Sequence, residues 1–436
     1  MTLVELRFSG SLDGLRPADR TALLQRRVSD DDLLRDTVGA TIDVVRREGD
    51  TALRALVREY DGVSLKALEV PRRRCIEALE RLDPSLRGAM ERAVRNIDAV
   101  HRSMLPTATE IVPEPGVVVT RRPIPLERVG VYVPGGKAAY PSSVLMGAVP
   151  ARVAGVREVI VCTPPDSSGA PSAAVLAACA LAGVDRVFAV GGAGAIAAMA
   201  YGTESIPRVD RIVGPGSVWV TEAKLQVARV VAIDAPAGPS ELLVLADESA
   251  DPAAVAREMV AQAEHDESAC VIAVALGERV ADRIEASLLA QASATRRGEI
   301  VRRALAGQGG VLAASSREQA LAFANAYAAE HLLLAVTDAS DWEEEIDNAG
   351  AVFVGSTSSV AFGDYMTGAN HVLPTGGLAR SYSGLSTLDF VRWVSRQSVT
   401  REAAESLAAD VAILADAEGL DGHARAARAW ANSEDT

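Results

Sequence analysis

Cysteine is scarce in this chain of 436 residues, which has four, and no two of them are spaced as in a CxxC motif. Cys75 stands alone, while Cys162, Cys179 and Cys270 lie in stretches rich in Val and Ala. A small buried thiol is the expected identity there. The sequence therefore indicates neither a disulfide framework nor a zinc-thiolate site.

Long apolar runs and an excess of positive charge are also lacking. No segment approaches the roughly 18 uncharged apolar residues that a membrane span needs, and Glu5 and Arg7 interrupt the N-terminus before any apolar stretch. The net charge of -14 repels phosphate backbones and anionic lipid surfaces. We expect a cytoplasmic protein that binds neither nucleic acid nor membranes.

The chain has no internal repeat, and its length predicts more than one domain with an ample core. Residues 16–104 read as helical. After them, short apolar, often β-branched runs alternate with Ala-rich helical stretches, which predicts an α/β fold with parallel sheets covered on both faces. The predicted strands are VGVYV (129–133), EVIVC (158–162), RVFAV (186–190), ELLVLA (241–246), CVIAVA (270–275), GGVLAA (309–314), HLLLAVT (331–337) and AVFV (351–354).

Two breaks interrupt this alternation. The loop APAGPS at 235–240 carries three turn formers, and we place a domain junction there. After the Ser/Gly-rich segment 381–387, a helical tail follows whose apolar faces are too modest for independent stability. We expect this tail to pack on something else, such as a second subunit.

Histidine is rare as well, with five residues, yet four of them each share a short segment with a carboxylate or an amide. The pairs are Gln262 with His265, Glu330 with His331, Asp364 with His371, and Glu418 with His423. Any one of these alone is better explained as a core or surface histidine. Together they indicate a metal-assisted acid/base site, because imidazole titrates near neutral pH and is the commonest metal ligand.

Gln262 and His265 stand three apart in a helical pattern, so they share one face. Asp364 and His371 lie in a Gly-rich segment that we expect to be an irregular loop. A site of two His, one Asp and one Gln contains no thiolate and suits zinc, with manganese as an alternative.

Glu330 and His331 come immediately before a predicted strand. An imidazole and a carboxylate at one rim would allow two proton transfers, one from an alcohol and one from a water molecule. The alternative is a capping Glu beside a surface His. Glu418 and His423 are separated by Gly residues that predict a break between two helices.

Two glycine-rich segments do not decide whether the chain binds a dinucleotide. Residues 192–197 match GxGxxA after a predicted strand, and Asp210 follows at the distance expected for a dinucleotide fingerprint. Small residues there could equally permit close packing of a helix on a strand. A second turn, VGPGS at 213–217, precedes a helix whose amides could receive an anion, whereas 130–137 is not a Walker loop.

With these segments in view, the chain resembles the histidinol dehydrogenase family over most of its length. The matching blocks are VGVYVPGGKAAYPSSVLMGAVPARVAGV, VGGAGAIAAMAYGTESIPRVDRIVGPG, DAPAGPSELLVLAD, AQAEHD, AEHL, GDYMTGANHVLPTGG, SGLS and EGLDGH. The resemblance implies a homodimer with two incomplete Rossmann-like parallel-sheet domains and helical extensions. It also implies oxidation of L-histidinol to L-histidine through L-histidinal, a four-electron reaction in histidine biosynthesis that uses two NAD+ and one Zn2+ per subunit.

The same resemblance assigns roles to individual residues. Glu330 and His331 would be the proton-transfer pair: His331 deprotonates the alcohol and Glu330 activates water for the second oxidation. The implied zinc ligands are Gln262, His265, Asp364 and His423, the last from the partner subunit's tail. The implied substrate-binding residues are Ser240, Gln262, His265, His331, Asp364, His371, Glu418 and His423. Tyr132, Gly194 and Ser217 stand at cofactor-binding positions.

The implied domain organisation divides the chain into four parts. Residues 1–25 form an N-terminal extension. Residues 26–128 with 238–380 form a first α/β domain that carries most metal and catalytic residues, and 129–237 form a second, on the NAD side. The tail, 381–436, would pack on a partner subunit.

Four positions depart from the family pattern. Gly194 and Ser217 replace a Gln and an Asn associated with NAD, and Leu333 and Val360 replace two acidic residues. Loss of polar groups that face a substrate would change specificity, so a paralogous dehydrogenase of another small amino alcohol or sulfodiol is the alternative. A more distant alternative is a zinc hydrolase that binds no nucleotide.

Overall fold

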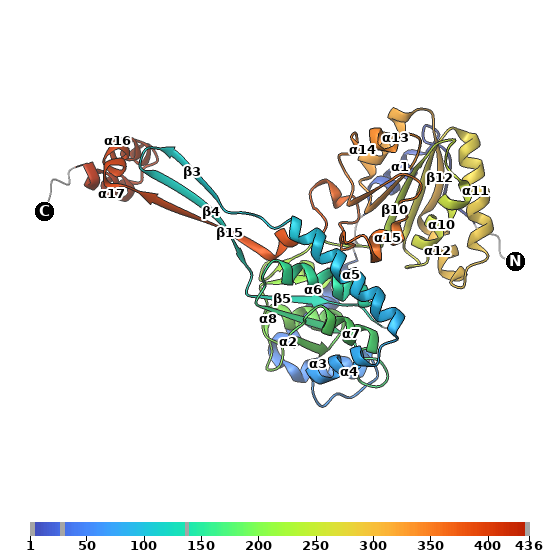
Figure 1. Ribbon diagram of the computed structural model, residues 1–436, viewed down its shortest axis with the longest axis horizontal. Coiled ribbons are helices and arrows are strands. Elements are labelled where there is room, and N and C mark those ends of the chain that lie inside the picture. The colour runs from blue at the N-terminus through green and yellow to red at the C-terminus, as the bar shows by residue number, and fades with distance from the viewer. Residues whose placement is uncertain (1–4, 27–30, 136–138, 432–436) are drawn as a thin grey trace. The chain divides into compact units, whose positions relative to one another are not determined.

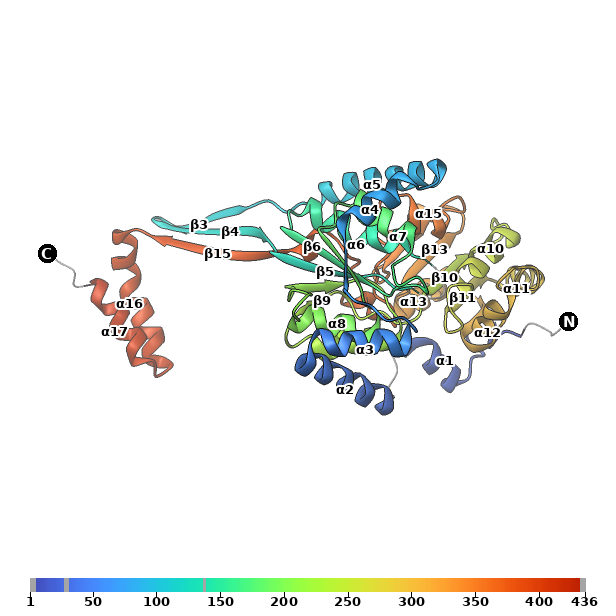
Figure 2. The same cartoon turned by 90° about the horizontal axis from the view of Figure 1, so that it is seen from below.

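A computed structural model describes residues 5–26, 31–135 and 139–431 of the chain. Residues 136–138, which include the last two residues of the segment 130–137 rejected above as a Walker loop, lie outside the described residues. The chain forms two compact units (Figures 1 and 2). Unit 1 falls within Met1–Met104 and Leu126–Phe390, and unit 2 within Leu105–Pro125 and Val391–Thr436.

Unit 1 contains two sheets, and the first, sheet A, has six strands that all run parallel. Their spatial order is β1 (Phe8–Ser11), β12 (Gly309–Ala314), β11 (Cys270–Leu276), β10 (Glu241–Ala246), β13 (His331–Ala335) and β14 (Ala351–Val354). The central strands are buried on both faces, as near-continuous apolar runs require in a parallel sheet.

Helices cover both faces of sheet A (Figure 1). Alternate residues point to opposite faces, so Leu242 and Val244 of β10 pack into one apolar cluster, and Leu243 and Leu245 into the other. The helices on the first side are α10 (Pro252–Ala263), α11 (Glu278–Ala292) and α12 (Gly298–Gln308). Those on the second side are α1 (Pro17–Leu24), α13 (Arg317–Tyr327) and α14 (Ala339–Glu343).

The second sheet of unit 1, sheet B, is also six-stranded and parallel except for its edge strand β2, which is antiparallel to β7. The strand order is β2 (Glu69–Val70), β7 (Arg186–Ala189), β6 (Glu158–Thr163), β5 (Arg128–Tyr132), β8 (Arg211–Val213) and β9 (Ala232–Ile233). The chain passes from sheet B to sheet A between β9 and β10, through the loop where the sequence places a domain junction.

Two groups of helices enclose sheet B, as Figure 2 shows. One group is α2 (Asp32–Glu48), α3 (Asp50–Tyr60), α8 (Gly192–Tyr201) and α9 (Val218–Val227). The other is α4 (Arg72–Glu80), α5 (Pro84–Ser103), α6 (Pro141–Val153) and α7 (Ala173–Leu181). The segment after α15 (Val360–Tyr365) is tied to this second group, because Asn96 donates to the Met366 carbonyl at 2.7 Å and Asn370 to the Met146 carbonyl at 2.8 Å. Short 3-10 turns follow at Leu378–Arg380 and Thr387–Phe390.

Unit 2 is built from a three-stranded antiparallel sheet and a helix pair. The sheet has the order β15 (Val391–Val399), β4 (Val117–Pro125) and β3 (Thr109–Glu114), and the helices are α16 (Arg401–Ala417) and α17 (Asp421–Ala431). Ala412, Ala415 and Ala424 form the small buried contact between the helices.

The α/β class and all eight strands expected from the sequence are confirmed. The expectation of a purely helical tail was wrong at its start, since β15 pairs with β4 over nine residues before α16 begins. The sequence of β15 is mostly polar and contains no long apolar run, so it did not indicate a strand. Among the described residues, no helix is long and apolar enough to cross a membrane. The domain boundaries expected above remain a proposal.

Candidate active site

The candidate acid/base pair lies at the amino ends of two neighbouring strands of sheet A. His331 is the first residue of β13 and pairs in register with Leu242 of β10, while Glu330 directly precedes it. Two nearby segments carry the other candidates: Gln262 is in the last turn of α10, and Asp364 is in α15.

Glu330 and His331 are both buried, and both are bound by the backbone of Glu241. The Glu241 amide donates to Glu330 Oε2 at 2.7 Å, and His331 Nδ1 lies 3.0 Å from the Glu241 carbonyl oxygen. A carbonyl oxygen can only accept, so Nδ1 of His331 must carry the proton. In the neutral ring, Nε2 is therefore the basic nitrogen.

His331 Nε2 faces Asp364 Oδ1 at 3.4 Å, and it has no hydrogen-bond partner among the residues that the structure describes. Burial alone would lower the pKa of His331, but the carboxylates of Glu330 and Asp364 outweigh it and raise this pKa well above its usual value. Burial raises the pKa of Glu330, although His331 opposes the shift. The two carboxylates thus favour the imidazolium form of His331, and burial favours the protonated form of Glu330.

Asp364 lies among three imidazoles. Burial would raise the pKa of Asp364, but the fields of His331, His371 and His265 lower it. His371 Nδ1 lies 2.9 Å from the Asp364 carbonyl oxygen, so it also carries its proton there and leaves Nε2 free. Burial lowers the pKa of His371, which favours the neutral form of this ring.

The donor set around Asp364 fits zinc in its chemistry. Gln262 is buried, at 3% exposed, and its amide oxygen is of a type that can bind a metal. Among the described residues, no three or more His, Cys, Asp or Glu side chains are grouped so that they could hold a metal ion.

Two local expectations were wrong. Gln262 and His265 do not share a helix face, because α10 ends at Ala263 and His265 lies in the following turn, where its amide donates to the Gln262 carbonyl at 3.2 Å. Asp364 is in the short helix α15 and not in an irregular loop. In both places a helix boundary falls within the motif, where sequence patterns locate it poorly.

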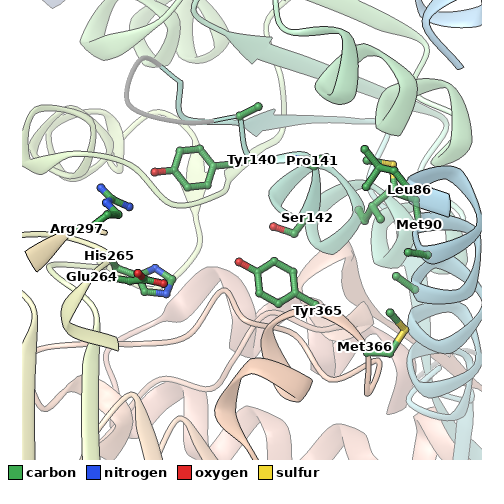
Figure 3. A pocket seen from close by; sticks show the side chains of 14 residues that line it. Leu86, Met90, Tyr140, Pro141, Ser142, Glu264, His265, Arg297, Tyr365 and Met366 are labelled. Atoms are coloured by element: carbon green, nitrogen blue, oxygen red, sulfur yellow. The ribbon is translucent and has the colours of Figure 1, made fainter. Parts of the chain in front are cut away.

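A cavity of about 370 Å³ opens beside His265 (Figure 3). At one end lie the polar side chains of Tyr140, Glu264, His265 and Arg297. At the other end lie Leu86, Met90 and Met366, with Ser142 and Tyr365 between the two ends. A small molecule with one polar and one less polar end would fit such a cavity.

The residues expected on the cofactor side lie in or next to sheet B. The glycine pattern at 192–197 does open helix α8 after strand β7, as the sequence predicts. Tyr132 ends β5, is buried, and accepts the Gly192 amide at 3.1 Å through its hydroxyl, while burial raises its pKa to about 12. Gly194 is buried against α3, where an added Cβ would lie 2.9 Å from Leu56 Cδ1. Ser217 is exposed at the start of α9.

Asp210, the acidic residue of the possible dinucleotide fingerprint, binds the backbone at the start of β5. Its carboxylate accepts the backbone amides of Glu127 and Arg128, at 3.0 and 2.9 Å. It therefore caps the entry to β5.

Three candidates remain outside this group. Ser240 directly precedes β10 and is half-buried, and its carbonyl accepts the Cys270 amide at 2.9 Å. Glu418 and His423 belong to unit 2 and are exposed, Glu418 at the end of α16 and His423 in α17. The break between the two helices that the glycines predict is confirmed.

Comparison with known proteins adds an independent finding. A family model described as histidinol dehydrogenase matches residues 24–430. A histidinol dehydrogenase of Methanosarcina mazei is 48% identical over 395 residues, which cover 90% of this chain and 91% of that protein. One of Natronomonas pharaonis is 48% identical over 411 residues, covering 94% and 96%. The crystal structure of histidinol dehydrogenase from Elizabethkingia anophelis matches with a TM-score of 0.93 and 34% identity, covering 98% of this chain and 99% of that one.

The chain belongs to the histidinol dehydrogenase family. It is therefore an oxidoreductase, and the resemblance drawn from the sequence blocks is confirmed. The individual roles of the site residues stay predictions.

Two of the departures from the histidinol dehydrogenase pattern have a packing explanation. Leu333 and Val360 are 3% and 4% exposed and lie in the same apolar cluster between sheet A and helices α10–α12. Phe353, whose ring centroid is 5.9 Å from that of His331, packs against this cluster. Neither residue lines the cavity beside His265. Their apolar character is thus satisfied within the core.

Two residues that contact the site were missed in the sequence, Glu241 and Arg26. Glu241 directly follows Ser240, so the polar end of the predicted strand was a usable signal. Arg26 stands in a charged helical stretch more than two hundred residues away, and nothing in its surroundings distinguishes it from a surface residue.

Proposed function

We propose that this chain catalyses the NAD-linked oxidation of L-histidinol to L-histidine by way of L-histidinal. Family membership over nearly the whole chain supports the reaction class. The observation that carries the assignment of roles is the orientation of His331, whose Nδ1 is committed to a backbone carbonyl while Nε2 remains free and faces Asp364.

In the first oxidation, His331 Nε2 is the base that takes the hydroxyl proton of the amino alcohol. The hydrogen bond to the Glu241 carbonyl fixes the tautomer of the neutral ring, so the lone pair is on Nε2, the nitrogen that faces Asp364. The neighbouring carboxylates of Glu330 and Asp364 then stabilise the imidazolium that forms.

In the second oxidation, Glu330 is the base that activates water for attack on the aldehyde. Its pKa is raised by burial, which brings it nearer to the operating pH and makes the carboxylate a stronger base than an exposed one. Its hydrogen bond from the Glu241 amide holds one oxygen, Oε2, in place.

Two groups are expected in addition to the chain. Zinc, held by Gln262, His265 and Asp364 and by His423 of the partner subunit, would orient the hydroxyl and stabilise its developing negative charge. NAD+ would accept the hydride, with Tyr132, Gly194 and Ser217 on its side of the site.

A homodimer is the assembly we propose. Unit 2 leaves large apolar side chains in solvent, among them Ile413 at 65% and Leu414 at 67% exposed, and these would be covered by a second copy. A His423 supplied across subunits can be tested by mixing. Neither His331→Ala nor His423→Ala alone should turn over, but a mixture of the two, reassembled as hybrid dimers, should regain activity through one intact site. No recovery, with hybrid dimers demonstrated, would contradict the shared site.

The function itself is tested by spectrophotometry of NADH formation. L-histidinol should give two NADH per molecule, whereas amino alcohols without the imidazole and sulfonated diols should react far more slowly. Faster turnover of another alcohol in that panel would show that L-histidinol is not the preferred substrate. Hydrolysis that does not depend on NAD+ would contradict the assignment as a dehydrogenase. Dialysis against a chelator should abolish turnover, and zinc should restore it.

A further inference from the structure

Behind the acid/base pair lies a buried carboxylate, Glu241, whose hydrogen-bonding capacity is filled. The side chain is 2% exposed and accepts four hydrogen bonds. Arg26 contributes Nε at 2.8 Å and one of its terminal nitrogens at 3.1 Å, the Gly376 amide lies at 2.8 Å, and the Glu330 amide at 3.3 Å. One carboxylate therefore joins the end of α1, the strand β10, the entry to β13 and the loop that follows His371.

Arg26 is held as firmly as its partner. Its side chain is buried and bidentate on Glu241. Its remaining donors reach the carbonyl oxygens of Leu23 and, at 2.9 Å, Tyr327. The guanidinium also stacks on the Tyr327 ring, with its carbon 3.4 Å from the ring centroid. Bidentate geometry and stacking together leave the pair little freedom.

The backbone of the residue that is anchored in this way contacts both members of the acid/base pair. The Glu241 amide donates to Glu330 Oε2, and the Glu241 carbonyl accepts from His331 Nδ1. The Glu241 side chain in turn accepts a hydrogen bond from the Glu330 backbone amide. The positions of both functional groups thus depend on where one residue is fixed.

A gain in folding stability does not explain the buried ion pair of Arg26 and Glu241. Bringing two charges into an interior costs about as much as their attraction returns, so buried ion pairs are often no more stabilising than apolar replacements. What such a pair supplies is a fixed geometry. A displacement of ~1 Å at a catalytic group can cost about a hundredfold in rate.

We propose that Glu241, held by Arg26, is the positioning residue of this active site. Its backbone amide binds Glu330 and sets the orientation of this carboxylate, the base of the second oxidation. Its backbone carbonyl binds His331 and sets the tautomer of this imidazole, the base of the first oxidation. The inference rests on the proposed function, because it names a residue through which the two proton transfers of that function are arranged.

The test is Glu241→Gln in the zinc-loaded enzyme, followed step by step. Single-turnover formation of NADH from L-histidinol and from L-histidinal should each slow by about 10- to 100-fold. The KM for NAD+ should stay as in the parent. In a Glu330→Gln background, Glu241→Gln should add little to the loss in aldehyde oxidation, since it acts through Glu330.

A second measurement does not depend on turnover. Nuclear magnetic resonance of protein labelled with 15N-histidine, with His331→Ala for assignment, should show His331 protonated on Nδ1 in the parent. In Glu241→Gln this signature should be lost or exchange-broadened. If L-histidinol proves not to be the substrate, this measurement still decides whether Glu241 holds the imidazole.

Two further variants separate positioning from folding. Arg26→Met combined with Glu241→Gln leaves no unpaired buried charge, so it should fold, yet it should show the same two slow steps. Asp50→Asn, which removes another buried and hydrogen-bonded carboxylate, should lower stability without touching either step. Parent-like rates on both steps in the folded double variant, or an unchanged His331 signature, would overturn the proposal.

Discussion

Glu330→Gln separates the two oxidations more sharply than any other single change. The substitution is isosteric, and the amide oxygen of Gln can still accept the Glu241 amide that now bonds Oε2 at 2.7 Å. It removes only the charge and the basicity. Position is therefore preserved while function at one step is lost.

The two steps should respond by different amounts. General-base assistance contributes about 10² to 10⁴ in rate, so oxidation of L-histidinal should slow by that factor. The first step loses only the support that Glu330 gives to a protonated His331. Asp364 lies at the same 3.4 Å from the other ring nitrogen and stays in place. We expect a loss of about tenfold there, equivalent to one pKa unit of imidazolium stabilisation.

Stopped-flow measurement of NADH, with L-histidinol and separately with L-histidinal, resolves the two phases. The pH profile adds a second criterion. A base must be ionised to act, and burial raises the pKa of Glu330, so aldehyde oxidation by the parent should rise with pH through a value above the usual range of Glu. In Glu330→Gln that limb should vanish.

A matched control is available at the opposite end of the same two strands. Asp247 follows β10, and its Oδ2 accepts the Thr337 amide just after β13 at 2.7 Å. Asp247→Asn should leave both phases unchanged. Equal slowing of the two phases in Glu330→Gln would refute the division of labour between Glu330 and His331.

Three other substitutions test individual readings of the site. Asp210→Ala should lower the free energy of unfolding in urea by about 0.5–1.5 kcal/mol, because the exposed backbone amides of Glu127 and Arg128 lose their acceptor. The KM for NAD+ should stay unchanged, and a raised KM would support the ribose-binding interpretation. Leu333→Ala should lower the free energy of unfolding of unit 1 by about 2–5 kcal/mol, because it leaves a cavity in the apolar cluster, while the KM for L-histidinol stays constant. Unchanged stability with a changed KM would instead make this position a specificity determinant. His101 is buried, neither of its ring nitrogens has a hydrogen-bond partner in the described part of the chain, and burial lowers its pKa, so the unfolded chain binds the proton more readily. Stability should fall as pH drops below about 6.5, with a slope of at most ~1.4 kcal/mol per pH unit. His101→Leu should flatten that slope in thermal melts at several pH values.

The strands of the two sheets could be predicted because apolar runs in a doubly covered parallel sheet stand out from Ala-rich helices. The strands of unit 2 could not be predicted in this way. Strands β3 and β15 are exposed along most of their length, so they lack the apolar pattern by which a strand is recognised. β15 depends on its pairing with β4, which is a long-range contact, whereas β3 forms a hairpin with β4.

The site shows the same division. Polar residues such as His331, Asp364 and Gln262 could be found in the sequence because charged and amide groups are conspicuous among apolar neighbours. Arg26 could not, since its burial arises only when the end of α1 meets β10. Candidate metal-binding and proton-transfer residues could be recognised within single segments of the sequence. A residue that positions them, such as Arg26, could be recognised only from the contact between segments in the folded structure.

The edges of the two sheets also differ in electrostatic character, and this difference suits the two expected ligands. Around the acid/base pair, the helices α10 and α13 end at Ala263 and Tyr327, shortly before the metal and proton-transfer candidates. A helix carries a partial negative charge at its C-terminus, which favours a zinc ion and an imidazolium.

At the carboxyl edge of sheet B, the opposite polarity prevails. The helices α8 and α9 begin there, at Gly192 and Val218, directly beside the candidate cofactor residues. Helix N-termini carry partial positive charge and free amides, which favour a pyrophosphate. Backbone dipoles would therefore draw a metal and a dinucleotide to different sheet edges. At Gly194 and Ser217, where the family pattern has Gln and Asn, two side-chain contacts to the cofactor would be lost, while the backbone contribution to its binding would remain.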